Sequence, residues 1–281
     1  MKNKTNFVFI GGVNRSGTTV LKEYLGLHPE CIAINWEPKF IEHGLLKCLY
    51  SDLDFDEIKA NFANKEHCTY PENKCKILLN WYYRAHNGQT QFEMVNWDKE
   101  LNKLEKMINN KNSLITRELS VKQFIYFCYS RVAKKHTKYI VIQAPRFSFW
   151  VNALLNLFPE SIYINVSRNP LDVISSLLGQ YWGPNTIEDG VEYYKNKSEQ
   201  IKKQLEGKML RKFESRLIKI KFEDFILENK KCTKELYHKL GLKYYKNYDI
   251  NVESAHIEGW RSRISNRDAH KIKQVLNFLK I

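Results

Sequence analysis

Five short apolar runs stand out in the pattern of hydrophobic and polar positions along the chain. Segments with helical spacing lie between them, and Gly11 and Pro145 closely follow two of the runs. Compact apolar runs are typical of buried strands in a parallel sheet that helices cover on both faces. The runs are residues 7–10, 31–34, 139–142, 162–166 and 217–222. We therefore expect an α/β fold of three layers, with a parallel sheet of about five strands.

A long segment separates the second apolar run from the third. It has helical spacing over residues 101–108 and aromatic clusters at 81–83 and 124–129. An insertion of this length at a sheet edge is expected to fold over the open end of the strands, where such sheets bind ligands. No break in composition divides the chain. We expect one domain, residues 1–281, with a helical insertion at about 48–138 that caps the ligand site.

The overall composition is that of a soluble globular protein, with 43% apolar and 27% charged residues. The first twelve residues begin with a basic position but contain too few apolar residues for a signal peptide or a membrane span. The six cysteines show no paired short spacing, and the closest two are Cys68 and Cys75. We expect reduced thiols, no bound metal and a cytoplasmic location.

The positive charge is concentrated in the last third of the chain. The formal net charge is +14; residues 195–221 hold ten Lys or Arg against three Glu, and residues 259–281 hold six against one Asp. A solvated, lysine-rich helix face would explain this distribution, and so would a surface that attracts nucleic acid or an anionic substrate. Charge alone does not choose between these explanations.

A glycine-rich turn follows the first apolar run. Residues 12–19 read Gly-Val-Asn-Arg-Ser-Gly-Thr-Thr and have the spacing of a phosphate-binding loop, but Thr18 stands where such loops carry lysine. Apolar residues then recur with helical spacing over 20–25, so a helix should begin near Gly17 and end within 26–29. The free N–H groups and the dipole of that helix start would bind an anion.

The missing lysine limits which anion this loop could bind. A kinase or NTPase uses the lysine between the β- and γ-phosphates while Mg²⁺ bridges them. Thr18 therefore argues against a Mg²⁺-dependent kinase, although the fold expected is that of P-loop nucleotide kinases. Arg15, which is planar and permanently charged, could instead clamp a single phosphate–sulfate unit. A glycine-rich turn without any ligand is the structural alternative.

Four segments resemble one enzyme family in order and spacing. Residues 15–19 (Arg-Ser-Gly-Thr-Thr) are followed by His28-Pro29, and Ala144-Pro145-Arg146 is followed by 164–176. These two pairs are similar to the first and second signatures of the sulfotransferases that use 3'-phosphoadenosine 5'-phosphosulfate. The resemblance covers both ends of the chain and skips about 48–138.

Two C-terminal segments extend the resemblance. Residues 218–225 resemble the family strand that ends in Tyr-Glu-x-Leu, and Gly259-Trp260-Arg261-Ser-Arg263 resembles its basic C-terminal loop. The resemblance implies that the donor binds across the loop, the second signature and the basic segment. The residues implied in donor binding are Arg15, Ser16, Gly17, Thr18, Thr19, Arg168, Ser176, Arg261 and Arg263.

The second signature also has a chemistry of its own. Arg168 ends a strand, Asn169 can cap the following helix, Pro170 suits its first position and Asp172 favours its first turn. Ser176 lies about two turns into that helix, on the side of Asp172. An arginine and a serine so placed can bind a second phosphate, which the resemblance assigns as the 3'-phosphate of the donor. An ordinary capped helix with a surface arginine is the alternative.

The acceptor hydroxyl needs a base, and Glu37 is the first candidate. It follows the second apolar run and matches the carboxylate of the family members that modify tyrosine and glycans. His43 is the second candidate. Arg15, with the loop N–H groups, would stabilise the leaving 5'-phosphate, so Glu37 and Arg15 are the expected catalytic residues.

Three positions depart from the family pattern. Gln143 replaces a lysine that many relatives have, so Arg15 or Lys39 must neutralise more of the leaving group's charge. Phe222 replaces a tyrosine that often contacts the donor. Trp260 could pack over the adenine or in the core.

These observations favour a sulfotransferase that needs no metal and transfers the sulfuryl group to a hydroxyl. The acceptor could be a glycan, a phenol or a peptide, with a glycan or small molecule favoured. The alternatives are a P-loop kinase of a small molecule and a basic nucleic-acid-binding protein. The second alternative predicts salt-sensitive binding to any duplex, whereas the sulfotransferase predicts binding of adenosine 3',5'-bisphosphate without metal.

Overall fold

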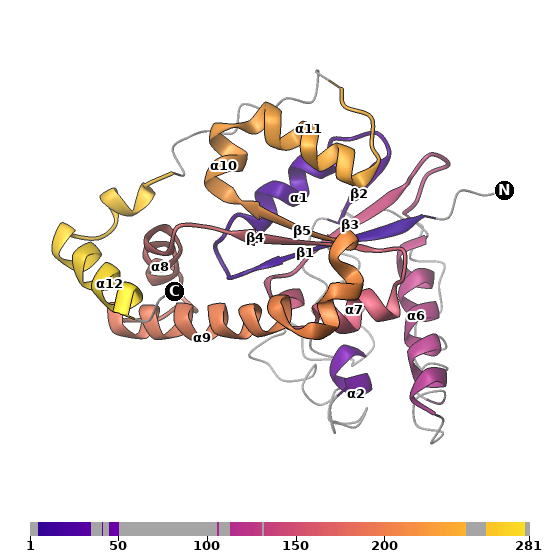
Figure 1. The fold of residues 1–281 in the computed structure, drawn as a ribbon, viewed down its shortest axis with the longest axis horizontal. Coiled ribbons are helices and arrows are strands. Elements are labelled where there is room, and N and C mark those ends of the chain that lie inside the picture. Colours follow the sequence, from indigo (N-terminus) through magenta and orange to yellow (C-terminus); the bar gives the residue numbers. More distant parts are fainter. Residues whose placement is uncertain are drawn as a thin grey trace.

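The computed structural model describes residues 5–34, 41, 45–50, 106, 113–130, 132–245 and 257–278. At its centre is a parallel, five-stranded sheet with the strand order β2-β3-β1-β4-β5 (Figure 1). The strands are β1 (Asn6–Gly12), β2 (Cys31–Ala33), β3 (Tyr139–Gln143), β4 (Ile162–Ser167) and β5 (Leu217–Lys221). The predicted α/β fold is confirmed, and each strand lies on one of the five apolar runs.

Helices cover both faces of the sheet and make the outer two layers (Figure 1). One face carries α1 (Thr18–Gly26), α10 (Phe222–Leu227) and α11 (Asn229–Leu240). The other carries α2 (Leu46–Tyr50), α6 (Leu114–Ser130), η3 (Pro145–Phe149), α7 (Val151–Leu157), α9 (Ile187–Glu206) and η4 (Lys208–Arg216). The helix that was expected to follow the glycine-rich turn is α1, within the predicted limits.

The central strand shows why the apolar runs are continuous. Phe7 and Phe9 of β1 pack in the cluster on the α7 face, whereas Val8 and Ile10 pack in the cluster on the α1 face. Successive side chains of a strand point to opposite faces, so a strand buried on both faces needs an apolar residue at every position.

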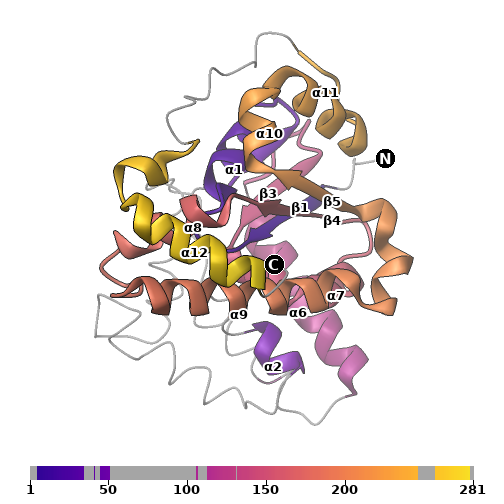
Figure 2. The same cartoon turned by 60° about the vertical axis from the view of Figure 1, so that its left-hand side comes forward.

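A third apolar cluster lies at one end of the molecule, between α8 (Pro170–Leu178), α9 and α12 (Asn266–Phe278). Figures 1 and 2 show α12 beside α8 and α9. The short helix η7 (Gly259–Ser262) adds Trp260, which is 5% exposed in this cluster. Of the two alternatives for Trp260, the structure therefore supports the core residue.

The register of the sheet brings several loops to one edge. Ile10 pairs with Gln143, and Gly12 pairs with Val166. The segments that follow β1, β3 and β4 therefore begin at the same level, beside the middle of the sheet. In open α/β sheets this edge is where ligands bind.

Two sequence predictions need correction or restriction. Phe222 was expected at the end of the last strand, but β5 ends at Lys221 and Phe222 begins α10. Glu223 and Asp224 lie in the first turn of α10, where negative charge favours a helix start. Residues 51–105 of the predicted insertion lie outside the described residues, whereas the aromatic cluster at 124–129 lies on α6 and packs against the core.

Within the described part of the chain, Cys31, Cys128 and Cys232 are free thiols. Burial raises the pKa of Cys31 to about 12. The helices of the described residues include none with the length and apolar character needed to cross a bilayer.

Candidate active site

The loop between β1 and α1 needs glycine at two positions. Gly17 precedes α1 with φ of 93°, in the left-handed region that side chains avoid. At Gly12, a Cβ atom would lie 2.3 Å from the carbonyl oxygen of Val166. The backbone therefore passes tightly over the end of β4 before the helix starts.

The ring of Phe222 packs against this loop at Gly17. A Cβ atom at Gly17 would lie 2.2 Å from Cδ2 of Phe222, whose side chain is buried. The Arg168 guanidinium lies over the same ring, 4.7 Å from its centroid. The phenylalanine that departs from the family pattern thus packs between the loop and Arg168.

Arg15 holds an unusual backbone conformation for a residue with a side chain. Its φ is 71°, and its Nε donates a hydrogen bond to Ser176 Oγ at 2.9 Å. Left-handed strain of this kind costs roughly 1–3 kcal/mol and is concentrated at functional sites. The Ser176 hydroxyl, which was expected to bind a phosphate together with Arg168, thus contacts Arg15, and its role in phosphate binding stays a prediction.

Arg168 lies directly after β4, and its guanidinium reaches back to the loop. Its Nη1 donates to the carbonyl oxygen of Arg15 at 3.1 Å, and its Nη2 lies 4.0 Å from Asp172 Oδ1. Burial lowers the pKa of Arg168, Asp172 and Glu223 raise it, and Arg263 and Arg15 lower it further. Arg168 thus contacts the loop at Arg15, and Arg263 lies near enough for its charge to act on Arg168.

The start of α8 has the capping structure that its sequence predicts. The Asn169 side chain accepts a hydrogen bond from the N–H of Leu171 at 2.9 Å, and Pro170 is the first helical residue. Glu223 of α10 accepts from the N–H of Asn169 at 2.8 Å. The Glu223 contact, which the sequence analysis missed, fixes the start of α8 against the neighbouring helix.

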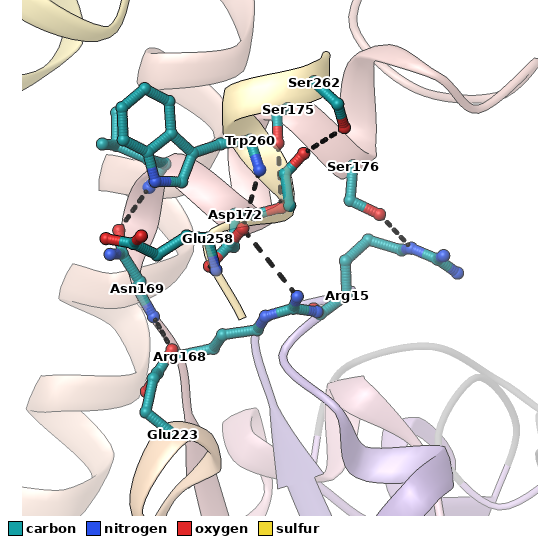
Figure 3. A network of polar contacts seen from close by, with 12 residues as sticks. Arg15, Arg168, Asn169, Asp172, Ser175, Ser176, Glu223, Glu258, Trp260 and Ser262 are labelled. Atoms are coloured by element: carbon teal, nitrogen blue, oxygen red, sulfur yellow. Dashed lines mark hydrogen bonds and ion pairs between the residues drawn. The ribbon is translucent and has the colours of Figure 1, made fainter. Parts of the chain in front are cut away.

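Asp172 does more than the predicted stabilisation of a first turn. Its carboxylate is buried and accepts hydrogen bonds from the backbone N–H groups of Glu258 and Trp260, at 3.1 and 3.0 Å (Figure 3). An acidic residue inside the apolar sequence of α8 was the available signal, but the partner segment could not be read from it.

The two C-terminal arginines differ in their surroundings. Both are exposed, and Arg261 forms a two-pronged ion pair with Glu258, with N–O distances of 2.8 and 2.9 Å. Arg263 lies against Gly259, where a Cβ atom would be 3.2 Å from Nη2. Of these two, Arg263 is the one whose charge acts on Arg168.

Three loop side chains have distinct environments. Gln143 Nε2 donates to Thr18 Oγ1 at 3.0 Å, and both residues are buried, so this glutamine fixes the orientation of the Thr18 hydroxyl. Thr19 is exposed at the helix start. Ser16 is 1% exposed, and its hydroxyl has no hydrogen-bond partner among the described residues. Most buried hydroxyls in proteins have a hydrogen-bond partner.

The candidate bases cannot be located in the same way. Glu37 and His43 lie outside the described residues, as does Lys39, which was expected to share the charge of the leaving group. Their roles stay predictions from the sequence.

Comparisons with known proteins show the family and the fold of the chain. A model described as the sulfotransferase family matches residues 8–246. The sulfotransferase domain from the curacin biosynthetic pathway is 14% identical, with 98% of each chain covered and a TM-score of 0.56. The sulfotransferase domain of the Synechococcus PCC 7002 olefin synthase is 13% identical, with 99% of this chain and 96% of that chain covered and a TM-score of 0.50. At such low identity, these two likenesses show a shared fold.

Among curated protein sequences, none matches this chain significantly. The family model nevertheless covers most of the sequence, including the loop, the second signature and β5. The chain therefore belongs to the sulfotransferase family.

Proposed function

We propose that the protein transfers the sulfuryl group of 3'-phosphoadenosine 5'-phosphosulfate to an acceptor hydroxyl, without a metal. The observation that carries this proposal is the contact of Arg15, in the loop after β1, with Arg168 and Ser176; the charge of Arg263 also acts on Arg168. A donor with two separated anionic groups accounts for cations on both the loop and the start of α8.

The residues present fit this donor. The loop N–H groups, the hydroxyls of Thr18 and Thr19, and Arg15 would hold the phosphate–sulfate end. Arg168 and Arg263 would hold the 3'-phosphate, with Arg261 at the rim. An anion beside Arg168 would also offset the burial and the neighbouring positive charges that lower its pKa.

The Ser16 and Ser176 hydroxyls would add hydrogen bonds to the donor. Ser16, with its unpaired buried hydroxyl, belongs to the loop that would surround the phosphate–sulfate end. Ser176 already accepts from Arg15, and a hydroxyl can donate one further hydrogen bond to a phosphate oxygen. Ser176 would thus orient Arg15 and contact the donor at once.

When bound, the donor supplies an activated sulfuryl group and a leaving phosphate. Because the protein makes no covalent bond in such an in-line transfer, its contribution is positioning and stabilisation of charge. Arg15, fixed by Ser176, would stabilise the charge that develops on the leaving phosphate. Thr18, fixed by Gln143, would present an oriented hydroxyl where related loops in kinases present lysine.

Glu37 is proposed as the base that accepts the proton of the acceptor hydroxyl, with His43 as the alternative. A positioned base contributes roughly 10²–10⁴ to the rate. We propose a glycan or a small molecule as the acceptor.

A transfer assay with a radiolabelled sulfuryl donor tests the proposed function. The purified chain should label at least one acceptor in a panel of oligosaccharides, phenols and peptides with EDTA present. Arg15→Ala should label it much more slowly, and Arg267→Ala, which changes an exposed arginine of α12, should label it at the normal rate. Labelling that requires Mg²⁺, or is equally fast in Arg15→Ala, would contradict the proposal.

A further inference from the structure

The basic segment 257–263 is attached to α8 through the packing of Trp260 and through the carboxylate of Asp172. Asp172 Oδ2 accepts from the N–H of Glu258 at 3.1 Å, and Oδ1 accepts from the N–H of Trp260 at 3.0 Å. These contacts join residues that are 86 and 88 positions apart in the sequence. Figure 3 shows Asp172 between the backbone of this segment and the side chain of Arg168.

The environment of Asp172 makes this attachment specific. The residue is 0% exposed, and a buried carboxylate is costly unless hydrogen bonds and opposite charge compensate it. Two N–H groups supply the hydrogen bonds, and Arg168, at 4.0 Å, supplies the charge. Hydrogen bonds to an ionised acceptor are about twice as strong as neutral ones.

Two features of the segment would otherwise disfavour its position beside Arg168. Glu258 adopts a left-handed conformation with φ of 54°, which is unfavourable for a residue other than glycine. The segment also brings the positive charge of Arg263 towards that of Arg168, and like charges repel. The negative charges of Asp172 and Glu223 offset this repulsion, and Asp172 contacts both the backbone of the segment and Arg168.

We propose that Asp172 is a positioning residue that holds segment 257–263 against Arg168, so that Arg168 and Arg263 face one phosphate of the donor. The carboxylate itself contacts neither phosphate nor acceptor. The identity of the ligand rests on the proposed function, but the link between Asp172 and the segment does not.

Asp172→Asn tests the link because it keeps the shape of the side chain. The amide oxygen can still accept a hydrogen bond from one backbone N–H group. The NH₂ group cannot accept one, and it would face the second N–H group and the Arg168 guanidinium. We expect faster hydrogen exchange at the amides of Glu258 and Trp260 in the ligand-free protein. Asp189→Asn, the same change at an exposed helix start, is the matched control and should leave this exchange unchanged. Unchanged exchange in folded Asp172→Asn would overturn the proposal.

Binding of adenosine 3',5'-bisphosphate separates positioning from mere stabilisation of the fold. Asp172→Asn should weaken binding at least about tenfold at a temperature where the variant is folded. On an Arg263→Ala background the same change should cost less than about threefold, because the segment then carries no arginine to position. Equal losses on both backgrounds would overturn the positioning role.

Two further outcomes remain decisive. Absence of bisphosphate binding in the unmodified chain would refute the proposed function, while the exchange experiment would still judge the link. If Asp172→Asn does not fold, exchange in the unmodified chain decides: bisphosphate should slow the amides of Glu258 and Trp260. No slowing on bisphosphate binding would overturn the proposal that this segment faces the phosphate.

Discussion

Nε of Arg15 donates a hydrogen bond to Oγ of Ser176 at 2.9 Å, between residues 161 positions apart. This contact joins the loop after β1 to the second turn of α8. Arg15 has a strained backbone conformation. Its side chain could adopt several rotamers, and the hydrogen bond to the Ser176 hydroxyl selects one of them. The loop and the second signature, which the sequence predicts to bind phosphate, are thereby joined to each other.

Ser176→Ala should weaken bisphosphate binding by about 1 kcal/mol, because Arg15 loses the acceptor that orients it. Calorimetry on a double-mutant cycle with Arg15→Ala measures this coupling. If Ser176 works through Arg15, the two losses are less than additive by roughly 0.5 kcal/mol or more. Additive losses would show that Ser176 acts on the donor independently of Arg15.

Gly17→Ala should disable the loop. The added Cβ would lie 2.2 Å from Phe222, and φ of 93° is unfavourable for alanine, so the loop must move. We expect bisphosphate binding to weaken at least about tenfold, with a lower melting temperature. Gly179→Ala is the matched control, since φ there is −82° and the nearest atom is 3.9 Å away. Equal effects of the two changes would contradict the structural reason given for Gly17.

Arg168→Ala should remove one charge-assisted contact to the donor and cost roughly 1.5–3 kcal/mol of bisphosphate binding. The KM for the acceptor should stay nearly unchanged, because the guanidinium contacts the loop and α8. Arg267→Ala, an exposed arginine on α12, controls for the loss of one positive charge. A change in acceptor KM that is as large as the change in bisphosphate affinity would exclude this assignment.

Glu37→Gln should slow turnover by roughly 10²–10⁴ and leave bisphosphate affinity intact, because a base acts on the acceptor and not on the donor. Single-turnover rates and calorimetry on the same preparation check both parts. Normal turnover would exclude Glu37 and direct the same test to His43.

Local signals in the sequence predicted most of the fold. The five apolar runs gave the strands to within two residues, and Asn169 and Pro170 gave the start of α8. Two positions of the runs, Ile34 and Phe222, lie outside the strands, and Phe222 lies where a strand passes directly into a helix. A large apolar residue is compatible with both elements, so periodicity could not separate them.

The site was predicted less completely, because its decisive contacts are long-range. The resemblance to the family indicated Arg15, Arg168 and Ser176, and the structure brings all three together. The bonds from Asp172 to Trp260, and the packing of Phe222 against Gly17, depend on how distant segments meet. A pattern within one segment cannot specify such contacts. The acceptor, the base and the expected cytoplasmic location stay predictions.

We propose that the loop after β1, which has Thr18 at the usual lysine position and carries Arg15, binds a nucleotide with separate 3'- and 5'-anionic groups and no metal. Titration of the purified chain with adenosine 3',5'-bisphosphate in EDTA, followed by calorimetry, tests it most directly. We predict saturable binding of one molecule per chain, which Mg²⁺ does not strengthen. Absence of binding, or binding only when Mg²⁺ is added, would contradict the claim.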